Sequence, residues 1–490
     1  MKNIKKVKKV KKIQKQEQVP SNKKRGSRTI LSIVYIFVGL FVLMMGYFSH
    51  FLLVKSKNVI NSTYNLRHDV LSKRIIRGKI LSADGLVLAE TITDEEDNEK
   101  RTYPFNDMYV PIVGRVSLGR TGIEETENIT LLTSDVDSAT TMYNDLVGVK
   151  NPGNNIITTL DHKLTKAAYD ALGDNKGAVV VIEPATGKIL AMVSKPSYNP
   201  NTIEADWDML TKDEDHESPL LNRATQGLYP PGSTFKVLTA LAYMRENKDY
   251  ENYTHNCKGK AEHDGMMIRC SGNSVHGKID FKVAFAKSCN SSFASMGKEL
   301  PINNFRNLCE SFFFNSTLPA RISSNPSVFK LKVGSSGVKE AMQTAIGQGK
   351  TLMTPFHNAM IAATVANGGV MMKPYAIDRV ENADGRVIKG YIPEEVDKLM
   401  TAKEADYLKG LMRAVVTEGT AESLESLNVK AAGKTGTAQQ EGKESHAWFI
   451  GFAPVGEPKI AISVLVENAG SGSKNAVPIA EKVFAAYFNK

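Results

Sequence analysis

The stretch PPGSTFK (residues 230–236) opens an apolar run, VLTALA, at residues 237–242. A Pro-Gly turn followed directly by such a run indicates the start of a helix. Because positions i and i+3 of a helix share one face, the Lys236 ammonium can approach the Ser233 hydroxyl. Serine is a poor nucleophile without an adjacent base, and lysine acts as a base only when burial or nearby positive charge lowers its pKa. The stretch therefore predicts a nucleophile and its base on one helix face.

The Ser-x-x-Lys spacing has little specificity by itself, because about two matches are expected by chance in a chain of this length. Five other pairs share the spacing: Ser21/Lys24, Ser295/Lys298, Ser327/Lys330, Ser336/Lys339 and Ser471/Lys474. Only the pair at Ser233 follows a Pro-Pro-Gly turn and opens an apolar run. The context therefore singles out Ser233 and Lys236.

Two further short segments follow in the chain. Ser288-Cys289-Asn290 comes first, and Lys434-Thr435-Gly436-Thr437 occurs once, after residues 429–433. A K-T-G-T run is expected by chance in only roughly one of a few hundred chains. Taken singly, the three segments are also compatible with a solvated helix face, a polar loop and a glycine turn. In this order they resemble the S-x-x-K, S-x-N and K-T-G elements of the penicillin-recognising serine acyltransferases.

The resemblance implies a division of roles in acyl transfer. Ser233 would be the nucleophile and Lys236 its base, and the positive charge of Lys434 would help to lower the pKa of Lys236. Ser288 would relay the proton to the departing amine. Whether a lysine or a water takes the first proton is left open by the motifs. Neither a metal ion nor an organic cofactor is implied.

The same resemblance assigns the contacts to the substrate. Asn290 would hydrogen-bond the amide backbone of the substrate, and Lys434 and Thr437 would hold its carboxylate. Thr435 and Gly436 would bind substrate from the same strand. The backbone N–H groups of the nucleophile and of Thr437 would form the oxyanion hole.

The four cysteines are Cys257, Cys270, Cys289 and Cys309. Cys289 stands where the related motif carries Asp, which points away from class A β-lactamases and favours a packing role for its side chain. Cys257 and Cys270 could form a disulfide in an oxidising compartment, and free thiols are equally compatible with their spacing. A zinc site of Cys257, His263, Cys270 and His276 can be imagined, but we set it aside because the spacing is irregular.

The formal net charge of +10 is concentrated at the N-terminus, where residues 1–28 hold twelve Lys or Arg and one Glu. Such a basic block can bind nucleic acid. However, residues 30–54 are almost wholly apolar and long enough to span a bilayer, and no small-residue cleavage pattern follows them. Positive flanks stay cytoplasmic. We therefore predict a basic cytoplasmic tail (1–28), an uncleaved single-pass anchor (29–54), a body outside the cell membrane and no nucleic-acid partner.

The roughly 435 residues beyond the anchor contain no second apolar span and are too many for one core. The run RGKILSADGLVLA (residues 77–89) resembles the stretch after the anchor in class B penicillin-binding proteins, and residues 101–104 and 114–124 continue the likeness to their short PbpA-like branch. We therefore expect a small β-rich pedestal domain over residues 55–150, too short to be a glycosyltransferase module. Residues 151–490 would form the penicillin-binding transpeptidase domain.

Strands are predicted at both ends of that domain. Residues 178–182 and 188–193 form a hairpin around the turn PATG, and residues 447–452 and 459–466 follow the Lys434 strand. A helix over residues 479–488 closes the chain. The pattern predicts an α+β fold, in which an antiparallel sheet has helices on both sides and carries an inserted helical cluster. The segment GQG (residues 347–349) also matches the family and is expected to border the cleft.

As a whole, the resemblance implies a peptidoglycan D,D-transpeptidase that cross-links stem peptides through an acyl-serine and is blocked covalently by β-lactams. Its partners would be stem peptides, β-lactams, the membrane and a glycosyltransferase of the SEDS family. A D,D-carboxypeptidase or β-lactamase-type hydrolase is the alternative enzyme, and fast deacylation would reveal it. A β-lactam sensor would need a signalling domain, for which a tail of about 28 residues is short. A scaffold with a vestigial site is the remaining possibility, although the intact motifs argue against it.

Overall fold

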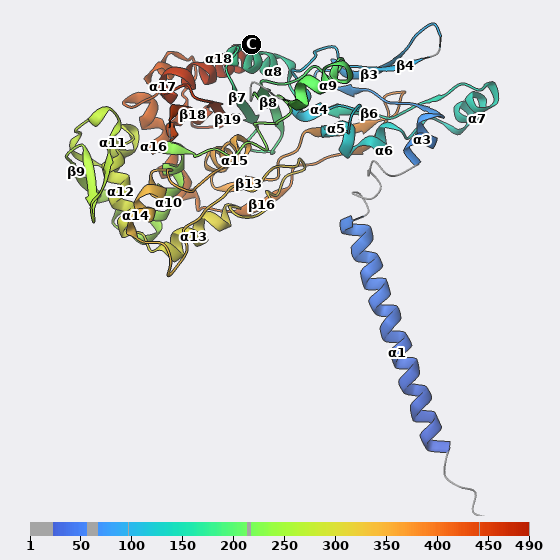
Figure 1. Ribbon diagram of the computed structural model, residues 1–490, viewed down its shortest axis with the longest axis horizontal. Helices are drawn as coiled ribbons and strands as arrows, with labels where there is room; N and C mark the ends of the chain where they lie inside the picture. The colour runs from blue at the N-terminus through green and yellow to red at the C-terminus, as the bar shows by residue number, and fades with distance from the viewer. Residues whose placement is uncertain (1–22, 56–66, 97, 213–216, 441, 490) are drawn as a thin grey trace, which may run out of the picture. The chain divides into compact units, whose positions relative to one another are not determined.

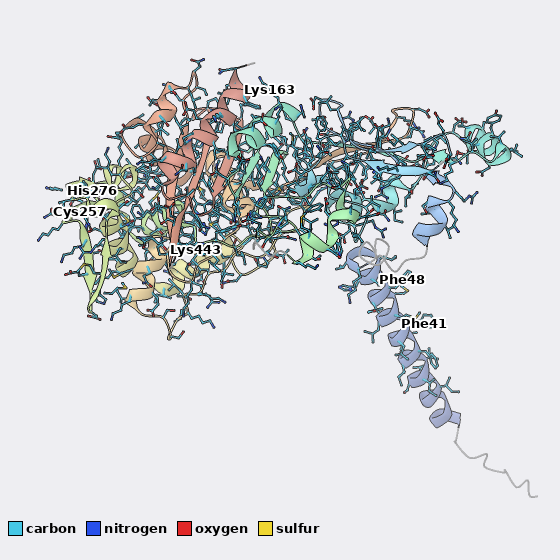
Figure 2. All side chains as sticks on the ribbon, turned by 45° about the horizontal axis from the view of Figure 1, so that its top comes forward. Phe41, Phe48, Lys163, Cys257, His276 and Lys443 are labelled. Atoms are coloured by element: carbon cyan, nitrogen blue, oxygen red, sulfur yellow. The ribbon has the colours of Figure 1, made fainter. Side chains whose placement is uncertain are left out.

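The computed structural model describes residues 23–55, 67–96, 98–212, 217–440 and 442–489. The chain forms two compact units, Met1–Asn65 and Leu66–Lys490. In the first, helix α1 (Lys23–His50) continues into a π-helical turn, η1 (Phe51–Lys55). Its apolar side chains are exposed, as Phe41 and Phe48 show in Figure 2. Among the described residues, only Ile30–Lys55 is a helix long and apolar enough to cross a membrane. Most of the predicted basic tail lies outside the described residues.

A five-stranded antiparallel sheet lies at the centre of the second unit, in the order β17-β18-β19-β7-β8 (Figure 1). Its strands are β7 (Gly177–Ile182), β8 (Ile189–Lys195), β17 (Ala432–Gln440), β18 (Lys443–Ala453) and β19 (Ile460–Val466). The predicted hairpin is confirmed, because β7 pairs with β8. Since β19 pairs with β7, strands from the two ends of the predicted transpeptidase domain lie side by side.

Helices cover both faces of this sheet, which is why every side chain of β7 and β19 is buried. Helices α8 (His162–Leu172) and α18 (Val477–Phe488) pack together on one side, and α15 (Pro355–Ala366) lies on the other (Figure 1). All twelve residues of α15 are buried. The remaining elements near the sheet are α16 (Ala402–Thr417), η5 (Glu422–Ser426) and α17 (Gly472–Asn475). The predicted α+β fold is confirmed.

Between β8 and β17 the chain inserts a mainly helical region. Its helices are α9 (Ile203–Lys212), η2 (Gly232–Phe235), α10 (Lys236–Glu246), η3 (Tyr250–Asn252), η4 (Ser271–Asn273), α11 (Phe281–Ala286), α12 (Asn290–Glu299), α13 (Ile302–Ser311) and α14 (Val338–Ala345). Two antiparallel pairs decorate it: β9 (Thr254–Cys257) with β12 (Gly277–Asp280), and β10 (Lys260–His263) with β11 (Met266–Arg269). Residues 236–244 of α10 are all buried, so the helix that carries Lys236 lies in the core of this insert.

A six-stranded sheet, β15-β14-β6-β2-β3-β4, lies at the N-terminal end of the second unit. Its strands are β2 (Ile80–Leu81), β3 (Val87–Thr93), β4 (Glu99–Thr102), β6 (Asn155–Thr158), β14 (Ile377–Glu381) and β15 (Val387–Gly390). Two short pairs accompany it, β1 (Ile75–Ile76) with β5 (Asn151–Pro152) and β13 (Val370–Met372) with β16 (Glu395–Lys398). Strands β14 and β15 come from the far side of the sequence boundary predicted at residue 150, so the two predicted domains share this sheet.

The predicted pedestal is strand-rich only in its first half. Among its described residues, five helices complete it: α3 (Arg67–Ser72), α4 (Val110–Val113), α5 (Gly122–Thr126), α6 (Asn128–Leu131) and α7 (Ser138–Val147). Most of these helices are a single turn long. Side-chain contacts, more than helix propensity, must therefore hold this region.

One fully buried carboxylate, Glu124, ties the pedestal together. Arg77 Nε donates to its Oε2 at 2.7 Å and Arg101 Nε donates to its Oε1 at 2.8 Å. The two arginine side chains are only 10% and 9% exposed, and Glu124 is not exposed at all. Burial works to raise the pKa of Glu124, but the charges and hydrogen bonds of Arg101 and Arg77 outweigh it and hold that pKa below its ordinary value. Arginines from two separate strand regions are therefore linked through one helix.

Candidate active site

The nucleophile candidate, Ser233, lies in the 3₁₀ turn η2, directly before α10. The sequence predicted the start of a helix here, and the structure refines this prediction to a 3₁₀ turn that leads into an α-helix at Lys236. Residues three apart are eclipsed in a 3₁₀ turn, so Ser233 and Lys236 still share one side. Ser233 is half-buried, whereas Thr234 and Phe235 are buried. Its hydroxyl is thus placed at the rim of a packed core.

The base candidate, Lys236, is fully buried. Its Nζ donates to the carbonyl oxygen of Ser288 at 2.8 Å and to Asn290 Oδ1 at 2.7 Å, and lies 3.2 Å from Ser288 Oγ. Burial lowers the pKa of Lys236 to about 7. The structure therefore brings the first and second motifs together around one amine.

A neutral amine has two N–H donors and one lone pair. The carbonyl oxygen of Ser288 and the amide oxygen of Asn290 match these two donors. The lone pair of the neutral Lys236 amine is then available to accept a hydroxyl proton. The protonated form would instead donate to all three oxygens, Ser288 Oγ included, so the contacts fit both forms, and it is the lowered pKa of Lys236 that makes the neutral form accessible near neutral pH.

Ser288 and Asn290 occupy the turn between α11 and α12. Ser288 adopts a left-handed conformation, φ 54°, which is uncommon for a residue other than glycine. Asn290 begins α12, and its Nδ2 donates to the carbonyl oxygen of Arg269 at 2.9 Å. The turn is therefore constrained from both sides, and it presents both side chains to Lys236.

The third motif lies on β17, which is an end strand of the five-stranded sheet, so its outer edge is unpaired within the described sheet. Lys434 is fully buried, and its Nζ donates to the carbonyl oxygen of Thr435 at 3.2 Å. Burial and then repulsion from Lys236 lower the pKa of Lys434 well below its ordinary value. The hydroxyls of Thr435 and Thr420 lie 2.5 Å apart. The two motif lysines thus share one poorly solvated region.

Close backbone contacts join β17 to the nucleophile turn. A Cβ built on Gly436 would lie 3.0 Å from Thr234 Cγ2, and one built on Gly232 would lie 2.7 Å from the carbonyl oxygen of Thr437. Thr437 itself is exposed. Glycine at these two positions therefore lets the exposed end of β17 approach the Ser233 turn.

The predicted position of the GQG segment beside the cleft is supported by its contacts. Gly347 adopts φ +74° and accepts a hydrogen bond from the Gly232 N–H at 2.9 Å. Gln348 Nε2 lies 3.5 Å from the Thr437 carbonyl oxygen. The segment therefore supports both the nucleophile turn and β17.

We expect Gly347→Ala to slow acylation of Ser233 on the order of 100-fold, because a Cβ there would lie 1.8 Å from the Gly232 carbonyl oxygen and must displace the turn. Gly349→Ala is the matched control: its φ is +80°, but the nearest atom would be 3.6 Å away. Acylation rates of the two variants with a fluorescent penicillin test this. Equal rates would show that backbone strain alone, and not the contact with Gly232, matters.

Three residues that support the site were not found from the sequence. Asn358 Nδ2 donates to Thr234 Oγ1 at 3.1 Å, Trp448 Nε1 donates to the Pro230 carbonyl oxygen at 3.0 Å, and Thr420 bonds Thr435. Of the three, only Asn358 could have been noticed in the sequence, because it is a polar residue within the mostly apolar run that forms α15. The other two act through contacts between distant segments.

The cysteines agree with the free-thiol alternative, and with neither the Cys257–Cys270 disulfide nor the zinc set that contains His263. All four are buried and free. Cys257 and Cys270 are neighbours, but their sulfurs lie 3.7 Å apart. His263 lies beside Asp264 and is not part of the cluster, whereas Cys289 joins Cys257, Cys270 and His276. Cys289 is buried behind the second motif, at the N-cap of α12.

Comparison with known proteins identifies the family of the chain. A family model described as the penicillin-binding protein transpeptidase domain matches residues 177–485, and one described as the penicillin-binding protein A dimerisation domain matches residues 77–156. The chain is 33% identical to peptidoglycan D,D-transpeptidase PbpA of Mycolicibacterium smegmatis over 463 residues, which cover 86% of this chain and 92% of the relative.

Solved structures agree with the sequence comparison. An acyl-enzyme complex of penicillin-binding protein A from M. tuberculosis superimposes with a TM-score of 0.78 at 30% identity, and covers 86% of this chain and 100% of that one. The D,D-transpeptidase domain of a peptidoglycan glycosyltransferase from Eggerthella lenta matches with a TM-score of 0.77 at 29% identity, covering 85% and 99%. The chain therefore belongs to the class B penicillin-binding proteins, in their short PbpA-like branch.

Proposed function

We propose that the protein is a serine-type peptidoglycan D,D-transpeptidase. The observation that carries the proposal is the Lys236 amine, fully buried and held by Ser288 and Asn290, three residues after Ser233. The PbpA relative, similar over most of its length, is named for this activity, and the M. tuberculosis structure is an acyl-enzyme complex.

The reaction has two acyl transfers. Ser233 Oγ attacks the carbonyl carbon of the D-Ala-D-Ala bond of a donor stem peptide, and Lys236 takes the hydroxyl proton. The backbone N–H groups of Ser233 and Thr437 stabilise the oxyanion. As the C–N bond breaks, Ser288 passes its hydroxyl proton to the leaving D-Ala and takes the proton held by Lys236, whose amine becomes neutral again. The amine of a second stem peptide then attacks the ester carbonyl and loses a proton to the same base, which returns it to Ser233 Oγ as the ester C–O bond breaks.

Substrate recognition is assigned to the edge of β17 and to the second motif. The unpaired edge of β17 can bind an extended peptide as an additional strand. Lys434, Thr435 and Thr437 face the carboxylate end of that peptide, and Gly436 belongs to the same substrate-binding strand and lets it approach the turn that carries Ser233. Asn290 bonds the peptide amide. A β-lactam presents the same carboxylate and a reactive amide, so it acylates Ser233, and we assign no deacylating carboxylate among the described residues.

We infer the membrane arrangement from charge and hydropathy. The anchor crosses the membrane once, the basic tail stays on the cytoplasmic side, and the catalytic unit lies outside. This places Ser233 where peptidoglycan is assembled. A SEDS-family glycosyltransferase, meeting the anchor and the pedestal, would supply the glycan strands that carry the donor peptides.

The rate of acylation should depend on pH through Lys236. Burial lowers the pKa of Lys236 to about 7, so the amine gains its basic form as the pH rises through that value. We expect the rate of penicillin acylation to rise about tenfold per pH unit below the pKa and to level off above about pH 8. Stopped-flow labelling of the full-length protein in detergent measures this. A flat profile across that range would contradict Lys236 as the base.

Transfer and hydrolysis can be distinguished with one assay. The full-length protein is incubated with a D-Ala-D-Ala-terminated pentapeptide and a labelled D-amino acid as acceptor amine. A transpeptidase forms a new amide with the label, and Ser233→Ala forms none. Release of unlabelled tetrapeptide would instead assign the protein to the D,D-carboxypeptidases. Rapid hydrolysis of penicillin would assign it to the β-lactamases.

A further inference from the structure

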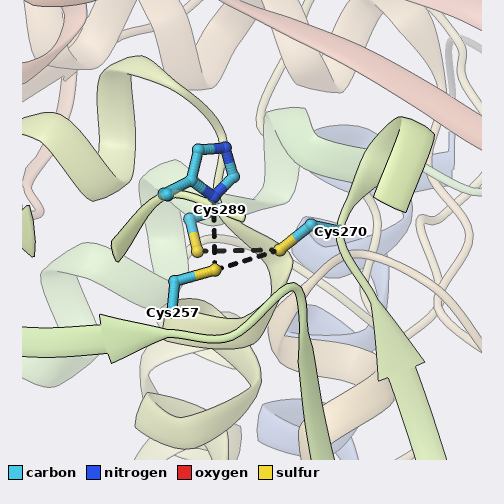
Figure 3. A group of neighbouring side chains, drawn as sticks. Cys257, Cys270 and Cys289 are labelled. Atoms are coloured by element: carbon cyan, nitrogen blue, oxygen red, sulfur yellow. Dashed lines mark hydrogen bonds between the residues drawn. The ribbon is translucent and has the colours of Figure 1, made fainter. Parts of the chain in front are cut away.

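Four metal-binding side chains from separate elements meet behind the second motif (Figure 3). Cys257 ends β9, Cys270 follows β11, His276 precedes β12, and Cys289 caps α12. One ligand atom from each lies within 4.8 Å of all the others. Cys257 and His276 are neighbours in the strand-bearing part of the insert (Figure 2).

The distances match the edges of a tetrahedron around a zinc ion. Zinc binds thiolate sulfur at about 2.3 Å and imidazole nitrogen at about 2.0–2.1 Å, so tetrahedral ligands are about 3.8 Å apart for two sulfurs and about 3.5 Å for sulfur and nitrogen. The Cys257–Cys270 and Cys270–Cys289 sulfurs are 3.7 and 3.8 Å apart, and Cys257 Sγ lies 3.3 Å from His276 Nδ1.

The backbone around the three sulfurs is arranged for thiolates. Each sulfur accepts one backbone N–H: Cys257 from Gly259 at 3.4 Å, Cys270 from Ser291 at 3.5 Å and Cys289 from Ser292 at 3.4 Å. Such outer contacts orient the ligands of a metal and stabilise their negative charge. Packing of neutral thiols would not require a donor for every sulfur.

We propose that Cys257, Cys270, His276 and Cys289 form a structural Cys₃His zinc site. Four protein ligands leave no open position, which is the arrangement of structural zinc sites, and soft thiolates with an imidazole favour zinc over magnesium or calcium. Binding displaces the thiol protons, and no electron transfer is involved. A Cys257–Cys270 disulfide is the competing state, but it would remove two ligands and leave Cys289 with no sulfur partner.

A bound ion would hold the turn that carries Ser288 and Asn290 in place. Cys289 lies between Ser288 and Asn290, the two residues that hold the Lys236 amine. The backbone carbonyl oxygen of Arg269, next to Cys270, accepts the hydrogen bond from Asn290 Nδ2. A metal that fixes Cys289 against Cys270 therefore fixes both partners of Lys236. The four ligands are positioning residues, because none of them contacts substrate.

The first test measures metal and thiols on the full-length protein, purified in detergent under reducing conditions without chelator. We expect one zinc per chain by elemental analysis, and a mercurial thiol reagent should release that zinc as it reacts with the three cluster thiols. Replacement by Co²⁺ should give the intense visible absorption of tetrahedral cobalt together with a sulfur-to-cobalt charge-transfer band. A mapped Cys257–Cys270 disulfide, or a protein that binds neither metal, would overturn the proposal.

The second test uses His276→Ala and Cys309→Ala. His276 is half-exposed and can be removed without opening the core, whereas Cys309 is a buried thiol on α13 outside the cluster. We expect His276→Ala to lose stoichiometric zinc and the cobalt spectrum of the wild type, and Cys309→Ala to retain both. Acylation by penicillin should slow at least tenfold in His276→Ala and in chelator-treated wild type, where added zinc restores it. Retention of zinc and of the spectrum by His276→Ala would overturn the ligand assignment.

Discussion

Replacement of Lys236 by methionine should reduce the rate of penicillin acylation by about 10²- to 10⁴-fold, which is the contribution expected of a general base. Methionine keeps a long unbranched side chain in the buried space but offers no lone pair of comparable basicity. The removal of a buried amine also removes its desolvation cost. That gain offsets the loss of the hydrogen bonds to the Ser288 carbonyl oxygen and Asn290 Oδ1, so the variant should fold with a stability close to that of the wild type while Ser233 loses its base.

Lys339→Met provides the matched control, because Ser336 and Lys339 share the Ser-x-x-Lys spacing but Lys339 is exposed. Its acylation rate should equal that of the wild type. Thermal unfolding, followed by tryptophan fluorescence, should give similar melting temperatures for both variants. A folded Lys236→Met protein that acylates at the wild-type rate would refute the role assigned to Lys236.

Replacement of Glu124 by glutamine should lower the free energy of unfolding by about 3–5 kcal/mol, which is the cost of removing one partner from a buried ion pair. Glutamine is nearly the same size, but it leaves Arg77 and Arg101 without a counter-charge. Denaturant titration of the full-length protein measures the loss. Glu125→Gln is the control, since Glu125 is exposed and should change stability by less than about 0.5 kcal/mol.

The same pair predicts a pH dependence of stability. The pKa of Glu124 is below its ordinary value in the folded protein, so its contribution is complete above the unfolded pKa of about 4.3 and is lost as the pH falls through the folded pKa. Wild type should therefore lose stability in acid more steeply than Glu124→Gln. Parallel curves for the two proteins would show that the ion pair contributes little.

The three catalytic motifs could be predicted from the sequence because each is a local pattern whose residue types follow from the chemistry. The Pro-Gly turn before Ser233 and the buried run after it defined the helix start, and the alternation of strand and turn residues at 177–195 defined a hairpin. The structure then placed Ser288 and Asn290 within hydrogen-bond distance of Lys236. The sequence could name these partners only by resemblance.

Contacts between distant segments were beyond the sequence patterns. The pairing of β14 with β6 joins residues about 220 positions apart, and neither strand carries a signal for its partner. The cysteine cluster shows the same limit. The zinc set that we set aside for its irregular spacing contained His263, whereas the cluster in the structure contains Cys289, which lies on another element. The domain boundary at residue 150, the membrane orientation and the glycosyltransferase partner stay predictions.

The most direct test of the account is to locate the β-lactam adduct. The full-length protein is labelled with penicillin, and intact mass and peptide mapping are compared with those of Ser233→Ala. We predict one acyl group per chain, on the peptide that carries Ser233, persisting for hours, and no adduct on the folded alanine variant. An adduct on another residue, or a folded wild type that takes up none, would contradict the assignment of Ser233 as the nucleophile.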